Sequence, residues 1–276
     1  MKFNVYQKLC ALYLVGLMVY WIILLESGLT SSLFNFGYSL AFTFIPFIGG
    51  IIGLLRAKIW GGFKSTVGKS MVFFSAGLFL WGCGNLVWAY YNFILNVAAP
   101  YPSWADLGFA PGILFWIIGA AYLSRATGAK FQLRKLSGKI AAILLLLTAA
   151  LLSYYLLVVV ARGGIITTKD GGNIKLILDI AYPLGDFLAF TTSALLIGLS
   201  LRYFGGAYAV SIVCTLSGLA VMFIADVMFS FTTTAGTFYN GSFGDLILTL
   251  GLFLITFGIL GFASKPSVAS GGSNVR

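Results

Sequence analysis

Two carboxylates, Asp226 and Asp245, lie in the apolar stretch from Gly218 to Gly251, on either side of a short loop rich in Gly, Thr and Tyr. An ionisable side chain in such a stretch is costly to bury, so it is paired, faces water or has a function. A carboxylate in that setting can bind a cation or basic ligand, or hold a proton. These two residues are therefore the first candidates for a functional site.

The remaining acidic residues show the same distribution. Of the seven, only Asp170 lies in a loop, and the others fall near the ends of apolar stretches, all on one predicted side: Glu26, Asp106, Asp179, Asp186, Asp226 and Asp245. In Asp106, Asp186 and Asp245 the acid follows a Pro or Ser by three or four residues. This spacing is typical of a helix start, where free N–H groups and the helix dipole stabilise an anion. Each of the three can therefore be a simple helix cap or part of a site.

Asp226 has no such explanation. It is predicted near the end of an outward-going helix, where the dipole is unfavourable to an anion, so it must be protonated, hydrated or paired with a donor. A comparison of the two halves of the chain places Asn85 at the corresponding position. An Asn there can form interhelical hydrogen bonds without a charge. We interpret Asp226 as a ligand, ion or proton site, with structural hydrogen bonding as the alternative.

Aromatic residues gather at the same predicted boundary: Tyr90, Tyr91, Tyr101, Trp104, Tyr182 and Tyr239. Such residues usually form the interfacial belt of a membrane protein. The alternative is that some of them line an outward-facing pocket for a cation or a cationic amphiphile. The candidate ligand-binding residues are Asp226, Asn85, Asp186, Asp245, Asp106, Asp179, Tyr182, Tyr239 and Trp104.

Long apolar stretches must position these side chains. The 276 residues are 60% hydrophobic and 9% charged, with a mean hydropathy of +1.00, which indicates an integral membrane protein. A stretch of roughly 20 apolar residues crosses the bilayer as a helix. Eight are present: 9–26, 36–55, 70–93, 103–123, 140–161, 183–201, 208–231 and 243–263. We predict an all-α, polytopic transmembrane bundle of eight spans that forms a single membrane domain (1–265), with a flexible cytoplasmic tail (266–276).

Basic residues give the predicted orientation. Of the 17 Lys and Arg residues, all but Arg162, Lys169 and Lys175 fall on one face of the eight-span topology. The positive-inside rule places that face, and both termini, in the cytoplasm of a cell-membrane protein. This distribution explains the net charge of +10 without nucleic acid as a partner. Contact with anionic lipids or a partner is the alternative role of these residues.

The two halves of the chain resemble each other. Gly77 aligns with Gly218, Asn85 with Asp226, and Asp106 with Asp245, while Tyr38–Leu40 aligns with Tyr182–Leu184. The simplest account is duplication of a four-helix unit, 1–135 and 136–265. Because each unit crosses the membrane an even number of times, the repeats would be parallel.

Several chemistries are excluded by residue type. The chain has no His, so a His-ligated haem, the usual zinc or copper sites and a Ser-His-Asp triad are all excluded. No Lys lies within a predicted span, which excludes a retinal Schiff base. The three Cys residues fall in apolar stretches and are interpreted as packing residues. The sequence indicates neither a metal site nor a particular cofactor.

Three short patterns carry a resemblance: Tyr101-Pro-Ser-Trp-Ala-Asp106, Tyr182-Pro-Leu-Gly-Asp186, and Asp226-x-x-Phe-x-Phe with Gly236-x-x-Tyr239-x-Gly241 and Asp245. They resemble the multi-span amino-terminal sensory domains that precede diguanylate cyclase or histidine kinase modules in prokaryotes. The resemblance implies sensing of an outer or intramembrane signal. Because only a short Ser and Gly-rich segment follows Ala263, we expect signalling through a separate cytoplasmic protein and no catalysis by this chain.

Two other function classes stay open. Leu184-Gly-Asp186-Phe resembles the Gly-Asp motif of intramembrane aspartyl proteases, although Pro183 replaces a glycine and no Pro-Ala-Leu motif follows. An aspartate pair would then form between Asp186 and Asp226 or Asp245. A cation-coupled transporter or channel is the other alternative, but the predicted cytoplasmic halves of the spans contain no acid that would continue a relay.

Overall fold

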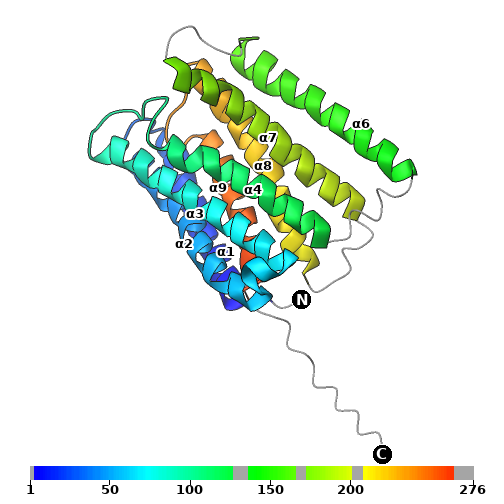
Figure 1. The fold of residues 1–276 in the computed structure, drawn as a ribbon. Coiled ribbons are helices and arrows are strands. Elements are labelled where there is room, and N and C mark those ends of the chain that lie inside the picture. Colours follow the sequence, from blue (N-terminus) through cyan, green and yellow to red (C-terminus); the bar gives the residue numbers. More distant parts are fainter. Residues whose placement is uncertain (1–2, 127–135, 166–171, 201–207, 264–276) are drawn as a thin grey trace, which may run out of the picture.

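The computed structural model describes residues 3–126, 136–165, 172–200 and 208–263, apart from the side chains of 197–200. This part of the chain forms helices and loops and contains no strand, which confirms the all-α prediction for it. The predicted tail (266–276) and the loop acid Asp170 lie outside it. Figure 1 shows long helices that run side by side in one bundle.

Eight long helices are described. They are α1 (Val5–Ser27), α2 (Leu33–Ala57), α3 (Thr66–Phe93), α4 (Asp106–Ala126), α6 (Leu136–Ser153), α7 (Gly172–Ser200), α8 (Ala209–Thr234) and α9 (Phe243–Gly261). Helix α6 continues directly as a π-helix, η3 (Tyr154–Val160), and two short 3₁₀ turns, Lys58–Trp60 and Gly62–Lys64, follow α2.

Local sequence explains where several helices begin. The side chains of Asn4 and Gln7 form a reciprocal capping box at the start of α1, and Ser32 and Asn35 do the same at α2. Helix α1 ends at Gly28, whose positive φ of 64° suits a residue without a Cβ. The membrane helices are therefore delimited by short polar motifs in the loops.

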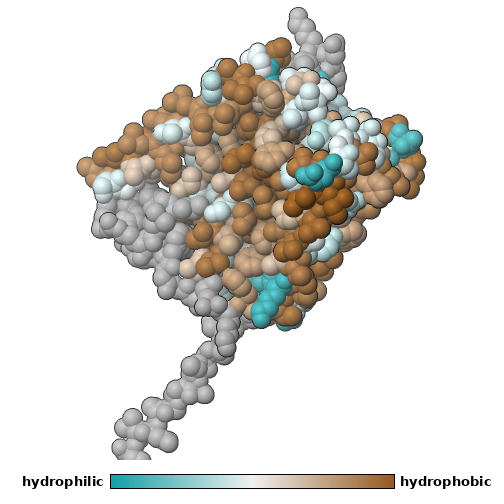
Figure 2. Space-filling view, turned by 180° about the vertical axis from the view of Figure 1, so that it is seen from behind, coloured by the Kyte–Doolittle hydropathy of each residue, from teal (hydrophilic) through white to brown (hydrophobic). Residues whose placement is uncertain are grey.

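Seven helical segments in the described residues are long and apolar enough to cross a membrane. Their outer faces carry many exposed Leu, Ile, Val and Phe side chains, and the surface in Figure 2 is predominantly hydrophobic. These features support a membrane protein. The orientation of the termini stays a prediction.

The predicted span 183–201 is wrong at its start. Helix α7 begins at Gly172 and contains Pro183 in its interior. It therefore includes Lys175 and Asp179 in addition to Asp186, and it has more charged residues than any other described long helix. Proline is tolerated inside helices of membrane proteins when neighbouring groups satisfy the freed carbonyl, so the helix-start signal of Pro183 was ambiguous.

Helix contacts close a ring. Helix α3 packs against α2 and α4, α4 packs against α7, α7 against α8, α8 against α9, and α9 returns to α2. Helix α1 packs outside α2 and α9, and α6 packs outside α7, where Figure 1 shows it at the edge of the molecule. Within the first four helices and within the last four, each helix packs against the next one along the chain.

Glycines bring the paired helices close together. A Cβ on Gly77 would lie 2.5 Å from Trp116 and 2.9 Å from the carbonyl oxygen of Gly112, joining α3 to α4. A Cβ on Gly218 would lie 2.6 Å from Ile255 and 2.9 Å from the carbonyl oxygen of Gly251, joining α8 to α9. Small residues at such positions let helix backbones approach within the membrane.

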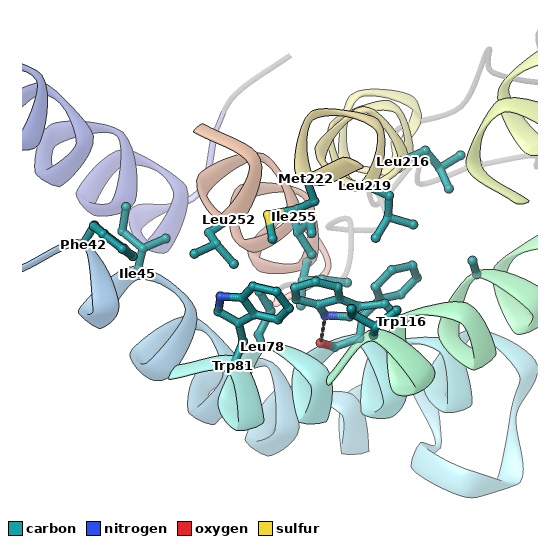
Figure 3. Close-up of a cluster of buried hydrophobic side chains, with 14 of the residues drawn as sticks. Phe42, Ile45, Leu78, Trp81, Trp116, Leu216, Leu219, Met222, Leu252 and Ile255 are labelled. Carbon is teal, nitrogen blue, oxygen red and sulfur yellow. Dashed lines mark hydrogen bonds between the residues drawn. The ribbon is translucent and has the colours of Figure 1, made fainter. Parts of the chain in front are cut away.

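The core lies where these pairs meet. Trp116 and Trp81 stack with ring centroids 5.1 Å apart, beside Met222, Leu252 and Ile255 from the other helix pair (Figure 3). The indole N–H of Trp116 donates to the carbonyl oxygen of Phe74 at 3.3 Å. The centre of the bundle is therefore filled by side chains from both halves.

The end of the bundle where α2 and α9 finish is closed by aromatic residues. The ring of Trp60 lies 5.1 Å from that of Tyr208, and Tyr208 stacks on Phe262 at 5.1 Å. The Trp60 indole donates to the carbonyl oxygen of Phe262 at 2.7 Å. This end of the bundle is therefore tightly packed.

Candidate functional site

A cavity of about 740 Å³ opens at the end of the bundle where α3 and α8 finish and α4 and α9 begin. Its volume is in the range of sites that hold a small organic molecule. The wall is mostly apolar and aromatic, and it includes side chains from α2, α3, α4, α7, α8 and α9. The cavity thus lies between the two halves of the chain.

Eight of the nine candidate residues line this cavity: Asn85, Asp106, Asp179, Tyr182, Asp186, Asp226, Tyr239 and Asp245. Trp104 does not, because its side chain is 72% exposed on the surface beside the start of α4. That exposure fits the interfacial belt rather than a pocket wall. The structure therefore brings together residues that are up to 160 positions apart in the sequence, from Asn85 to Asp245.

Asp106 is the first residue of α4, as the helix-start interpretation predicts. One carboxylate oxygen accepts the backbone N–H of Ser103 at 2.7 Å, and the other accepts the hydroxyl of Tyr182 at 2.5 Å. The second bond joins α4 to α7. Asp106 is thus a helix cap whose remaining oxygen holds the two halves of the bundle together.

Asp245 has the equivalent place in α9. It lies in the first turn, is 6% exposed, and accepts the backbone N–H of Gly241 at 2.6 Å. One turn further on, Thr249 shares a hydrogen bond of 3.1 Å with the hydroxyl of Tyr38 on α2. The pairing of α9 with α2 through Tyr38 corresponds to the pairing of α4 with α7 through Tyr182.

Asp179 is paired with a cation. It lies 3.7 Å from the guanidinium of Arg162, which follows η3, and it accepts the hydroxyl of Tyr101 at 3.1 Å. Arg162 also donates to the backbone carbonyl of Asp179 at 3.0 Å and to Ser230 at 3.3 Å. Burial, and then the nearby carboxylate, raises the pKa of Tyr101. The phenol therefore remains a donor at neutral pH.

The prediction that Asp186 lies in the first turn of a helix is wrong. Because α7 begins at Gly172, Asp186 lies in the middle of the helix and has no free N–H groups around it. Its side chain is buried, and it forms a side-chain hydrogen bond with Asp226 on α8. The helix-start explanation fails for Asp186, so this residue joins Asp226 as an acid without a local structural reason.

The Asp186 and Asp226 pair requires a proton, since two ionised carboxylates have no donor to share. The pair lines the main cavity and also a small void of about 10 Å³ beside Trp116 and Met222. Arg162 acts on Asp186 electrostatically from the same side. The pair is thus the polar centre of an otherwise apolar region, able to bind a cationic group or to hold a proton.

On the opposite wall, α3 presents a row of residues one or two turns apart: Trp81, Asn85, Trp88 and Asn92. Asn85, Asn92 and Trp81 are all at least nine-tenths buried, and the Nδ2 atoms of both Asn and the Nε1 of Trp81 have no hydrogen-bond partner. Trp88 donates to Asn240 at 3.1 Å. Except for Asn85, the sequence analysis missed these residues, although their helical spacing on one face was readable.

The sequence analysis also missed the two cations of the site. Arg162 and Lys175 both line the cavity, whereas they were interpreted only as exceptions to the basic-residue asymmetry. Their position on the side opposite most basic residues was the available signal. Among the residues that the structure describes, no three Asp, Glu, His or Cys side chains gather to hold a metal ion.

Known proteins offer no further guide to this site. Comparison of the chain with family models, with curated proteins and with solved structures finds no match in any of the three.

Proposed function

We propose that this chain is a ligand-binding membrane protein of the sensory-domain type, which binds its ligand in the cavity and acts through a separate cytoplasmic signalling protein. The observation that carries the proposal is the gathering of five carboxylates and an unpaired amide wall in one cavity of about 740 Å³. Helix α7 serves as the eighth span, and the cavity faces away from the cytoplasm.

The closure of the other end supports a receptor more than a conduit. Trp60, Tyr208 and Phe262 pack together there, and every described acidic residue except Asp186, in the middle of α7, lies toward the cavity end of its helix. A site that is open at one end only can report occupancy without passing its ligand through. A conformational signal would travel along the helices to the packed end.

Duplication of a four-helix unit supports the same proposal. The equivalent glycine contacts, the helix starts at Asp106 and Asp245, and the tyrosines 38 and 182 agree with the predicted alignment. In this scheme the ligand site lies at the interface of two repeats, where helix-bundle sites are often found.

Thermal unfolding of the purified protein in nanodiscs tests the proposal against a panel of amines, quinones, lipids and metal ions. A ligand should raise the unfolding temperature of the wild type and have a smaller effect on Asp226→Asn, which keeps the size of the side chain. Glu26→Gln is the matched control, because Glu26 is exposed and does not line the cavity. Equal shifts in all three proteins would refute a cavity ligand.

The Asp186 and Asp226 pair favours a second candidate, an intramembrane aspartyl hydrolase. Two carboxyls that share one proton can activate water and protonate a leaving group. Cleavage of a helical peptide substrate in proteoliposomes should then be lost in both Asp186→Asn and Asp226→Asn and retained in Glu26→Gln. Cleavage that persists in either Asn variant would exclude this function.

A further inference from the structure

The chemical class of the ligand can be inferred by separating cavity groups that already have partners from those that do not; this step rests on the proposed function. Asp106 is occupied by Ser103 and Tyr182, and Asp245 by Gly241. Asp179 is balanced by Arg162 and also accepts Tyr101. Each of these three carboxylates therefore already has a partner in the fold.

Two sets of groups remain. On the α7 and α8 wall, Asp186 and Asp226 are hydrogen bonded to each other, which requires a proton between them. On the α3 wall, three N–H donors from Trp81, Asn85 and Asn92 have no acceptor. A buried donor without a partner is unfavourable, so such groups in a cavity indicate an acceptor atom supplied from outside the protein.

Aromatic rings lie one turn beyond each polar residue. Trp88 follows Asn85 by three residues on α3, and Phe229 follows Asp226 by three residues on α8. Their ring centroids are 6.1 Å apart, and Phe238 packs against both. The rings of Trp88, Phe229 and Phe238 therefore form one aromatic cluster next to both polar walls. This cluster would cover the apolar part of a bound molecule.

We propose that the cavity binds an organic molecule that carries a protonated amine and a hydrogen-bond acceptor on an apolar or aromatic skeleton. The ammonium group binds the Asp186 and Asp226 pair, and the acceptor oxygen faces the N–H group of Asn85, which lies between Trp81 and Asn92 on α3. An ammonium donates to both carboxylates and replaces the proton between them. Binding therefore releases one proton to the solvent, which makes affinity rise with pH until the amine itself loses its charge.

Other charged and titratable groups surround the pair and do not reverse this result. Arg162 faces Asp186 from the end of η3, and Tyr182 lies on the same helix and senses the charge of Asp226. The same cavity is also lined by Lys175 and Tyr101 and by the three acids that already have partners, Asp106, Asp179 and Asp245. Arg162 repels a second cation, which favours a ligand with one ammonium group and not a diamine.

The ammonium can come from a soluble amine or from an aminophospholipid headgroup, since both combine an amine with acceptor oxygens. Nanodiscs made of phosphatidylcholine alone, or with added phosphatidylethanolamine, separate these sources. If the headgroup is the ligand, phosphatidylethanolamine should compete with a soluble amine and weaken its binding. If the source is soluble, the two nanodiscs should give the same affinity. Either result supports the amine class.

Calorimetry with L-phenylalaninamide tests the proposal, because this probe has an amine, a carbonyl and an aromatic ring. It should bind better than 2-phenylethylamine, which lacks the carbonyl, and much better than 2-phenylethanol or 3-phenylpropionate. Asp226→Asn should weaken binding by about tenfold or more, the usual effect of losing a charge-assisted hydrogen bond. The apparent enthalpy should vary with the ionisation enthalpy of the buffer, as expected for release of one proton.

Asn85→Leu isolates the acceptor contact. It should remove the advantage of L-phenylalaninamide over 2-phenylethylamine and leave the latter unchanged, while Glu26→Gln affects neither. The unfolding temperature of each variant checks that it is folded. Binding of 2-phenylethanol or 3-phenylpropionate as tightly as the amines would overturn the amine class but keep a cavity ligand. Failure of every probe to bind, in both nanodiscs, would overturn the amine class alone; the proposed function is overturned only if the wider panel of amines, quinones, lipids and metal ions also fails to raise the unfolding temperature.

Discussion

The hairpins α3–α4 and α8–α9 share several features but differ in a polar side chain of the first helix. In each, an acid at the start of the second helix accepts a backbone N–H from the loop before it, Ser103 for Asp106 and Gly241 for Asp245. About two turns before the first helix ends, α3 has Asn85 and α8 has Asp226. The scaffold is thus shared, and only one half carries an ionisable group at this depth.

The surroundings of this position differ in the same way. Asp226 is hydrogen bonded to Asp186 on α7. In the alignment that matches Tyr38 with Tyr182, the counterpart of Asp186 on α2 is Phe42, which is buried and also lines the cavity. A carboxyl pair on one wall therefore corresponds to an amide beside a phenyl ring on the other. We propose that the common positions maintain the fold and that the unequal ones determine what is bound.

The largest expected effect tests whether the hairpins are equivalent. Gly77→Leu and Gly218→Leu should each destabilise the protein by about 3 kcal/mol or more, because the new side chain would overlap the facing helix. Gly16→Leu on α1 is the control, since no atom lies within 4 Å of a Cβ there. Unfolding in a denaturing detergent gives the three values. A large effect at only one of the two hairpins would break the comparison.

The next prediction concerns a variant that places a carboxyl on α3 at the position corresponding to Asp226 on α8. Asn85→Asp adds a carboxyl to the α3 wall, from which no described Lys or Arg lines the cavity, and it should cost about 2 to 3 kcal/mol at neutral pH. Because protonation removes the charge, the loss should diminish as the pH is lowered. Unfolding of this variant and wild type at pH 5 and pH 8 measures the difference. If the loss of stability is the same at pH 5 and pH 8, the position of Asn85 discriminates against the shape of the new side chain and not against its charge.

A smaller effect compares the two interhelical tyrosine contacts. Tyr182→Phe removes the hydroxyl that donates to Asp106 and should cost about 1.5 to 3 kcal/mol, as is usual for a bond to a charged group. Tyr38→Phe removes a bond to the neutral hydroxyl of Thr249 and should cost about 1 kcal/mol. The ranking is read from the unfolding free energies. The reverse order would show that burial outweighs charge in these contacts.

The smallest effect concerns Tyr101, which has a raised pKa in the folded protein. The unfolded chain ionises this phenol near its ordinary value of 10.0, while the folded protein retains the proton. Stability should therefore be unaffected below that pH and should fall above it. Tyr101→Phe should show a shallower fall between pH 9 and pH 11, measured by unfolding. An unchanged slope would mean that Tyr101 ionises freely.

Local signals predicted much of the fold and part of the site. Asp106 and Asp245 were identified as helix-start acids because a cap depends on residues three or four positions away. Asp186 was misplaced because Pro183 suits both the first turn and the interior of a membrane helix. Arg162 was missed because its partner, Asp179, is brought near by the packing of α6 and α7, which no local pattern encodes.

The π-helix η3 has a consequence for register. A π turn takes up an extra residue, and in an α-helix each residue turns the chain by about 100°. Arg162 lies two residues after this segment. If Tyr154–Val160 wound as an ordinary α-helix of the same length, Arg162 would turn away from Asp179 by roughly that angle, whereas deletion of one residue from the segment together with a return to α-helix would keep Arg162 facing Asp179. The π-helix Tyr154–Val160 thus determines the direction in which Arg162 points.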